Sequence, residues 1–407
     1  MLSMSNCNTQ SRVRIIGNVA RREWRRLAGD RKFYLFVVIA PLVLALLFAA
    51  IYVNRAVKDL PVVALDNDNS ELSRMILRAL DTDRSLELTG TATSLDEIKD
   101  LFKRGRIQGA IYIESGLEED VKHGKQGKIV AYVNGANIIV ANLLNKAISS
   151  VSRTVVAGAN IQRFQAMGLS RQAATDRALP VKVESLPLFN PGYNYLNYLV
   201  PCLMIVLLQM IIMIASGQLI NTELAGNTYP ELVRTAGNSI FNMLAGKSIP
   251  HIFIHSCTTI TIIGLLMAIF GIPIKGSIFI GIAFTIYFVI VSHVIGLTAS
   301  FILPNPILVT EAMVFINAPA FVFSGYTFPI EAMPVFQKGF GLLMPFTHYL
   351  TGFIKIYQMG TPPGYLWPEF IKLSLYLIVA VIAILMTVHI KRPGYNNSNM
   401  IAEESAK

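Results

Sequence analysis

Two histidines, His251 and His255, stand four positions apart, which places both imidazoles on one face of a helix. That spacing suits a metal ion, but no glutamate follows the first histidine and no third ligand lies nearby in sequence, so the zinc-hydrolase pattern fails. We interpret the pair as polar packing within a helical bundle. Three other ionisable residues lie in or near apolar segments, where they are functional candidates by default: His293, Glu311 and His348.

The motif Ala245-Gly246-Lys247-Ser248 ends like a phosphate-binding loop. That loop needs a glycine five residues before its last glycine, and Phe241 holds this position. The loop should also follow a buried strand, whereas this motif opens an apolar segment. We therefore predict that Lys247 marks the edge of that segment and that this chain binds no nucleotide.

An acidic run, Asp66-Asn67-Asp68-Asn69-Ser70-Glu71, could suggest a calcium loop. Such a loop needs glycine at its sixth position and glutamate at its twelfth, and the run has Glu71 and Leu77 there. Helix capping and turn formation account for these acids. We predict no catalytic residue and no metal ligand in this region.

The elements that carry these residues are mostly apolar. Of the 407 residues, 53% are hydrophobic and 15% are charged, whereas about a quarter are charged in soluble domains. Six segments approach the roughly 20 apolar residues that a transmembrane helix needs. They are residues 33–52, 196–220, 248–270, 278–303, 307–325 and 370–390. The sequence therefore predicts an α-helical polytopic membrane protein.

The charges predict its orientation. Before the first span, eight basic residues face only Glu23 and Asp30: Arg12, Arg14, Arg21, Arg22, Arg25, Arg26, Arg31 and Lys32. Because cytoplasmic ends of spans are rich in Lys and Arg, we expect an amphipathic cytoplasmic region at 1–32; nucleic-acid binding is the alternative. Six spans return the tail 391–407 to the same side.

Residues 53–195, between the first two spans, alternate β-rich runs with helical patterns. Predicted strands are 61–65, 85–89, 107–113 and 129–133. Predicted helices are 71–80, capped by Ser70, and 95–104, opened by the capping-box pair Ser94 and Glu97. A long pattern with few helix breakers follows at 136–167. We therefore expect an inserted extracytoplasmic α/β domain with a long stalk helix.

Two connecting segments stand out within the five-span block 196–390. Residues 326–368 are apolar but interrupted by prolines at 329, 334, 345, 362 and 363, so we expect a re-entrant helical pair on the external side, with an ordinary loop as the alternative. Residues 221–247 are mildly polar, and Pro230-Glu231 predicts the start of a short helix. We expect that helix to lie along the cytoplasmic surface and to dock a partner.

Four stretches together resemble the ABC-2 type transporter permeases, in the subgroup with a large external domain that includes bacterial drug-export permeases. The first is Leu60-Pro61-Val62-Val63-Ala64-Leu65-Asp66-Asn67-Asp68-Asn69-Ser70. The second is Phe189-Asn190-Pro191-Gly192-Tyr193-Asn194-Tyr195 with Val200-Pro201. The third runs from Glu223-Leu224-Ala225-Gly226-Asn227-Thr228 to Gly246-Lys247, where Asn227 separates a glycine and a threonine that are usually adjacent. The fourth is Phe323-Ser324-Gly325-Tyr326-Thr327-Phe328-Pro329-Ile330-Glu331-Ala332-Met333-Pro334 with Met344-Pro345-Phe346-Thr347-His348-Tyr349.

The resemblance implies three groups of site residues. The segment that couples the permease to an ATPase would contain Glu223, Gly226, Thr228, Glu231, Arg234 and Lys247. A re-entrant gate motif would contain Ser324, Gly325, Phe328, Pro329, Met333, Pro334 and Pro345. The entry to the second span would contain Asn190, Pro191, Asn194 and Pro201.

The resemblance also implies a function and partners. The chain would be the permease subunit of an exporter in the bacterial cytoplasmic (inner) membrane, moving a hydrophobic or amphipathic substrate out of the cytoplasm or inner leaflet. Two copies of a separate ABC ATPase would bind ATP and magnesium, and a second permease chain, identical or a sister, would complete a path lined by the first, second and fifth spans. A periplasmic adaptor is a further candidate partner. The alternative is a membrane-anchored receptor or assembly scaffold without transport; an enzyme is disfavoured, since no catalytic constellation is visible.

Overall fold

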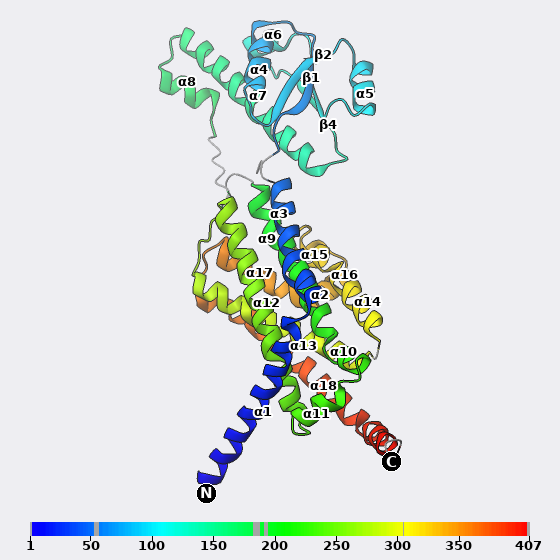
Figure 1. Cartoon of the computed structure of the whole chain (residues 1–407). Coiled ribbons are helices and arrows are strands. Elements are labelled where there is room, and N and C mark those ends of the chain that lie inside the picture. The colour runs from blue at the N-terminus through cyan, green and yellow to red at the C-terminus, as the bar shows by residue number, and fades with distance from the viewer. Residues whose placement is uncertain (1, 53–56, 182–187, 191–193, 304, 405–407) are drawn as a thin grey trace. The chain divides into compact units, whose positions relative to one another are not determined.

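The computed structural model describes the chain except for residues 1, 53–56, 182–187, 191–193, 304 and 405–407. It divides into two compact units. The membrane unit comprises Met1–Arg55 and Leu188–Lys407, and the inserted unit comprises Ala56–Pro187. Helices dominate, and the small sheet lies in the inserted unit (Figure 1). This architecture confirms the predicted fold class of a polytopic helical membrane protein with an inserted α/β domain.

Among the described residues, six helices are long and apolar enough to cross a membrane: Arg31–Ile51, Tyr195–Ala225, Ile240–Phe270, Ile278–Ile302, Pro306–Phe323 and Pro363–Ile390. The third begins at Ile240, earlier than the predicted residue 248, because Ser239 caps it by accepting a hydrogen bond from the Asn242 N–H. The predicted number of spans is confirmed.

The helices of the membrane unit have the following bounds. They are α1 (Leu2–Ala28), α2 (Arg31–Tyr34), α3 (Ala40–Ile51), α9 (Tyr195–Gly217), α10 (Leu219–Ala225), α11 (Tyr229–Thr235), α12 (Ile240–Phe270), α13 (Ile278–Ile302), α14 (Pro306–Asn317), α15 (Ala320–Phe323), α16 (Val335–Leu342), α17 (Pro345–Tyr357) and α18 (Trp367–Glu404). A π-helical turn, Leu35–Ile39, joins α2 to α3 and ends two residues before Pro41, which has no N–H to donate. Short 3₁₀ turns lie at Ile330–Ala332 and Pro363–Leu366.

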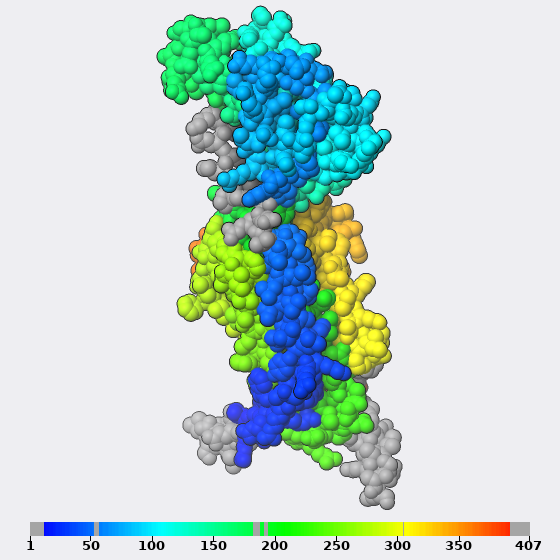
Figure 2. Space-filling view, turned by 45° about the horizontal axis from the view of Figure 1, so that its top comes forward, coloured from blue at the N-terminus to red at the C-terminus, as the bar shows by residue number. Residues whose placement is uncertain are grey.

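The second span is the centre of the membrane unit. Of its apolar window 67% is buried, against 22% for the first and fifth spans. Helix α9 packs against α13, α14 and α3. Figure 2 shows the first span as a ridge along the surface of this unit. The start of α1, helix α11 and the end of α18 lie at one end of the unit (Figure 1), as an even number of spans requires.

The segment 326–368 contains α16 and α17, neither of which is long enough to cross a membrane. Gly325 begins the segment in the left-handed region, at φ 85°, where a side chain would be strained. Gly341 of α16 packs so closely on Phe323 that a Cβ atom would lie 2.2 Å from its carbonyl oxygen. The glycines thus allow the chain to fold back tightly after α15.

The inserted unit has a four-stranded sheet in the order β2-β1-β3-β4. Its strands are β1 (Leu60–Asp66), β2 (Leu86–Thr91), β3 (Gly109–Ile113) and β4 (Ile129–Val133), with β4 antiparallel to β3 and the other pairs parallel. Its helices are α4 (Glu71–Asp81), α5 (Leu95–Lys103), α6 (Leu117–Lys122), α7 (Ile138–Ala166) and α8 (Arg171–Ala178). Helices α4 and α7 contribute to the core on one face, and α5 to the core on the other.

Local capping agrees with the sequence interpretation of this unit. Ser70 Oγ accepts a hydrogen bond from Ser73 N at 3.0 Å, and Asp68 carboxylate oxygens accept from the N–H groups of Gly116 at 2.7 Å and Glu118 at 3.2 Å. The long helix α7 differs from the predicted stalk, because Val140, Leu144 and Ile148 bury its first half against the sheet. Helices α6 and α8 are too short to show a clear apolar period and escaped prediction.

Candidate functional site: a buried ionic cluster

Charged side chains from three separate parts of the chain meet inside the membrane unit. We use the name ionic cluster for Arg22, Glu23 and Arg26 of α1, Glu223 of α10, and Lys247 and His251 of α12. The side chains of Glu23, Glu223 and Lys247 are at most 1% exposed. A buried charge is strongly destabilising unless it is paired, so the geometry of this cluster decides whether the three elements can pack.

Lys247 lies at the centre of the cluster. Its Nζ donates to Glu23 Oε2 at 2.6 Å and to Glu223 Oε1 at 2.7 Å. His251, one helical turn further along α12, places Nε2 3.0 Å from the other carboxylate oxygen of Glu23. One ammonium therefore joins α1 and α10 to the third span.

Glu223 also receives two arginines from α1. Arg22 forms a two-pronged pair, from Nη1 to Oε1 at 2.9 Å and from Nη2 to Oε2 at 3.0 Å, and Arg26 Nη1 donates to Oε1 at 2.7 Å. Such forked pairs fix orientation as well as charge. Thr228 Oγ1 donates to Oε2 at 2.5 Å, while Arg22 Nε lies 3.5 Å from Oε1 of Glu231, whose side chain is 69% exposed. The cluster thus extends from a buried centre to the surface.

The two α1 residues Arg22 and Glu23 are both ionised at neutral pH. Burial alone would raise the pKa of Glu23, but the hydrogen bond with His251 and the charges of Lys247 and Arg26 outweigh burial and lower it to about 2. The hydrogen bond to Glu223 raises the pKa of Arg22. Ionised partners of opposite charge therefore hold α1 in place.

Close packing of α1 on α12 surrounds the cluster. A Cβ atom on Gly246 would lie 2.5 Å from Val19 Cβ and 3.0 Å from the Ile16 carbonyl oxygen, so glycine is required for this approach. Trp24 meets Phe253 edge to face at a centroid distance of 5.7 Å. Val19 and Leu27 are buried on the same helix. The basic N-terminal run therefore folds into a helix that docks on the third span.

This packing gives each part of the 245–248 motif a structural role. Gly246 admits α1, Lys247 holds the cluster, and Ser248 Oγ lies 2.9 Å from His293 Nε2. The side chain of Lys247, which we predicted to mark an edge of the span, is 1% exposed because α1 and α10 cover it. The earlier start of α12 moves this residue into the second turn of the helix.

The buried histidines connect spans. The Nδ1 atom of His293, on α13, lies 2.7 Å from Ser216 Oγ of α9. Its Nε2 atom contacts Ser248 of α12, as described above. The His251 and His255 rings lie 6.0 Å apart by centroid. In the part of the chain that the structure describes, no three His, Cys, Asp or Glu side chains converge as metal ligands. His348 Nε2 lies 2.8 Å from the Leu342 carbonyl oxygen, and Glu311 is exposed.

The other predicted coupling residues surround a turn between α10 and α11. Gly226 is exposed, and Asn227 adopts φ 53°, a left-handed conformation that asparagine tolerates better than most residues. Pro230 occupies the first turn of α11, as predicted, and Arg234 is exposed in its last turn. We use the name exposed tip for residues 224–231. Within it, Leu224 is 44% exposed and the side chain of Glu231 is 69% exposed.

The entry to the second span is held by asparagines. Asn190 and Asn194 bond each other, and Asn194 Oδ1 caps α9 by accepting from Leu196 N at 3.0 Å. Pro201 lies buried inside α9 and cannot donate to the carbonyl of Asn197 four residues earlier. That carbonyl accepts hydrogen bonds from Tyr357 Oη and from Gln358 Nε2 instead. Pro191 lies outside the described residues.

The structure brings this entry next to the predicted gate motif. Tyr198 and Tyr326 stack at 4.5 Å, and each hydroxyl donates to the other's carbonyl, at 2.7 and 2.6 Å. Ser324 Oγ donates to Phe321 O at 2.7 Å and Gly325 turns the chain. The remaining members are placed as follows: Phe328 is 51% exposed, Pro329 precedes the 3₁₀ turn, Met333 follows it, Pro334 precedes α16 and Pro345 begins α17.

Sequence reasoning treated Arg22, Glu23 and Arg26 only as members of a basic run. One signal could have singled out Glu23, namely an acid within the basic run that has Arg26 three positions away on the same helix face. Tyr198 and Tyr357 gave no signal, because an aromatic residue in an apolar span is ordinarily packing. The cluster and the two tyrosine contacts depend on residues more than 100 positions apart.

Comparison with known proteins agrees with these features. The family described as ABC-2 family transporter protein matches residues 31–386. The Escherichia coli K12 protein "Probable multidrug ABC transporter permease YbhS" is 21% identical over 357 residues, which cover 84% of this chain and 88% of that protein. "Probable multidrug ABC transporter permease YbhR" of the same strain is 22% identical over 184 residues, which cover 44% of this chain and 48% of that protein. With a match that begins at the first membrane helix and ends inside the sixth, this chain belongs to the ABC-2 transporter family and is a permease.

Proposed function

We propose that this permease is the membrane half of an ATP-driven exporter whose ATPase binds at the exposed tip and at α1. The observation that carries the proposal is the ionic cluster. Through Glu223 it joins the exposed tip to α1, and through Lys247 it joins both to the third span. A push on the tip would therefore reach the transmembrane helices without passing through a flexible loop.

The energetics of buried charge support this role. Separating the tip from α12 would expose Lys247 or leave it buried without its partners, and breaking a buried pair costs roughly 3–5 kcal/mol. The cluster therefore favours movement of α1, α10, α11 and the start of α12 as one body. Export requires two packings of the spans that the bound ATPase stabilises to different degrees.

We further propose the inner membrane as the location, with both termini in the cytoplasm. Exposed basic residues of α1, among them Arg12, Arg14, Arg21 and Arg25, lie at the same end of the membrane unit as the exposed tip, which suits the positive-inside rule. The ATPase would be present in two copies and would bind ATP and magnesium itself. A second permease chain, identical or a sister, would pair with this one, and the inserted unit would offer a surface to a periplasmic adaptor.

The substrate would be hydrophobic or amphipathic and would leave the cytoplasm or inner leaflet along the first, second and fifth spans. Apolar side chains point outward from the first and fifth spans, for example Val43 at 56% and Phe315 at 79% exposure. Such faces suit lipid or a second permease chain. The two curated relatives carry multidrug permease names, which supports substrates of this class.

Inverted membrane vesicles test the proposal. Vesicles with the wild-type chain and its ATPase should accumulate a lipophilic dye when ATP is added, and Leu224→Glu should abolish the accumulation by placing a charge on the docking surface. Leu95→Glu is a matched control, since Leu95 is similarly exposed, at 38%, in the first turn of α5, where an acid is tolerated. ATP-independent dye levels in wild-type vesicles would favour the receptor or scaffold alternative.

A further inference from the structure

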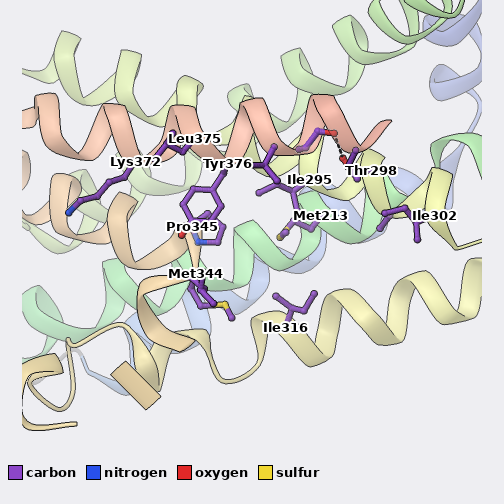
Figure 3. A pocket seen from close by; sticks show the side chains of 15 residues that line it. Met213, Ile295, Thr298, Ile302, Ile316, Met344, Pro345, Lys372, Leu375 and Tyr376 are labelled. Atoms are coloured by element: carbon purple, nitrogen blue, oxygen red, sulfur yellow. Dashed lines mark hydrogen bonds between the residues drawn. The ribbon is translucent and has the colours of Figure 1, made fainter. Parts of the chain in front are cut away.

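A cavity of about 670 Å³ lies in the membrane unit between α13, α18 and the turn before α17 (Figure 3). One wall is a single face of α18, formed by Leu375, Val379 and Ala383 at four-residue spacing. Ile295 and Ile302 of α13 also line the cavity, and Ile316 of α14 lies on the side away from α18 (Figure 3). The cavity is thus a slot that runs along two helices and not a compact pocket.

Away from Lys372, the two side-chain hydroxyls that line the slot already have hydrogen-bond partners. The hydroxyl of Thr298 already donates to the carbonyls of Val294 at 2.8 Å and Ala380 at 3.2 Å. The hydroxyl of Tyr376 donates to the Leu342 carbonyl at 2.8 Å. A polar ligand would lose its own hydrogen bonds to water on entering, whereas an alkyl chain would lose none. The lining therefore suits an apolar chain.

One end of the slot carries a cation. Lys372 lines that end and its side chain is exposed (Figure 3). Among the described residues its ammonium forms no ion pair, although Lys355 nearby in sequence is paired with Glu369 at 2.9 Å. An anionic group can therefore approach Lys372 without displacing a partner.

The length of the slot matches one leaflet. Lys372 and Ala383 are eleven residues apart on α18, which corresponds to about 16 Å along the helix axis. Half the hydrocarbon core of a bilayer is about 15 Å thick. We propose that the slot binds one acyl chain of an anionic phospholipid from the external leaflet, with the phosphate at Lys372 and the chain end at Ala383. The choice of leaflet rests on the orientation proposed above, whereas the binding itself does not.

Native mass spectrometry of the purified full-length chain tests the site. The chain in mild detergent is supplied with equal amounts of phosphatidylglycerol and phosphatidylethanolamine, and the lipid retained per chain is counted. We expect one retained lipid, preferentially phosphatidylglycerol, and a preference lowered about fivefold by Lys372→Gln, the loss expected for one lysine at a lipid surface. Lys338→Gln is the matched control, because Lys338 is exposed on α16 outside the slot.

A second pair of variants tests the chain end. Ala383→Phe would fill the inner end of the slot and should lower the retention of both lipids. If Ala383→Phe lowers the melting temperature of the protein, the smaller change Ala383→Leu replaces it in the same test. Ile382→Phe is the control, because Ile382 is half-exposed and does not line the slot. Equal preference in wild type and Lys372→Gln, or unchanged retention in both Ala383 variants, would overturn the proposal. A lipid-free dimer that these substitutions dissociate would overturn it as well, since a second copy would then cover the slot.

Discussion

At the scale of single residues, the buried ammonium of Lys247 needs both of its carboxylate partners, Glu23 and Glu223. Removing this ammonium would leave Glu23 and Glu223 close together, without the fully buried cation that both contact at 2.6 and 2.7 Å. We expect Lys247→Met to lower the free energy of unfolding by about 3 kcal/mol, measured by thermal or denaturant unfolding in detergent. An exposed pair of similar geometry, Lys99 with Asp96 at 2.9 Å, provides the control, and Lys99→Met should have no measurable effect. Equal losses in the two variants would contradict the special role of the cluster.

Glu23 makes the docking of α1 sensitive to acid. Its pKa is lowered to about 2 from an ordinary value of 4.5, so its stabilising contribution is complete above about pH 4.5 and is lost as the pH falls towards 2. Trp24 reports docking through its contact with Phe253, and Trp367→Phe removes the second of the two tryptophans. Emission from Trp24 should be constant from pH 8 to pH 5 and shift to longer wavelength below pH 4.5. A shift centred above pH 5 would show that Glu23 is not held in its ionised form.

At the scale of elements, the close approach of α1 to α12 depends on Gly246, which has no Cβ atom. We expect Gly246→Ala to displace α1, because the new methyl group would meet Val19 and a backbone oxygen of α1. The displacement should appear as a shift of Trp24 emission to longer wavelength at neutral pH. Gly264→Ala is a matched control on the same helix, where no atom lies within 4 Å of the added Cβ. If both alanine variants keep the wild-type emission, the close contact does not position α1.

The elements were predicted from the sequence to different degrees. Strands and capped helices of the inserted unit followed from local patterns, because the capping oxygen of Ser70 and its donor, the Ser73 N–H, lie three residues apart. The six spans followed from their length and apolarity. The ionic cluster did not, since a carboxylate at position 23 carries no local sign that its partner is Lys247. Long-range pairing of charges is set by how the helices pack, and one sequence alone does not contain that information in a local form.

At the scale of the whole molecule, the two units have separate hydrophobic cores. The inserted unit folds around its own sheet, while the membrane unit joins a surface turn to its spans through buried charges. The family match covers both units, and the sequence motifs that suggested this family lie in both. We therefore propose that ATP hydrolysis acts on the exposed tip and that substrate moves among the spans of the membrane unit.

The most direct test of this account is recovery of the ATPase. The tagged chain is purified gently from native membranes, and co-purifying proteins are identified by mass spectrometry and assayed for ATP hydrolysis. We predict that the wild-type chain and Leu95→Glu retain an ABC ATPase and that Leu224→Glu, with an unchanged melting temperature, loses it. Retention of the ATPase by Leu224→Glu at the wild-type level, or its absence from the wild-type preparation, would contradict the assignment of the exposed tip and the ionic cluster as the coupling site.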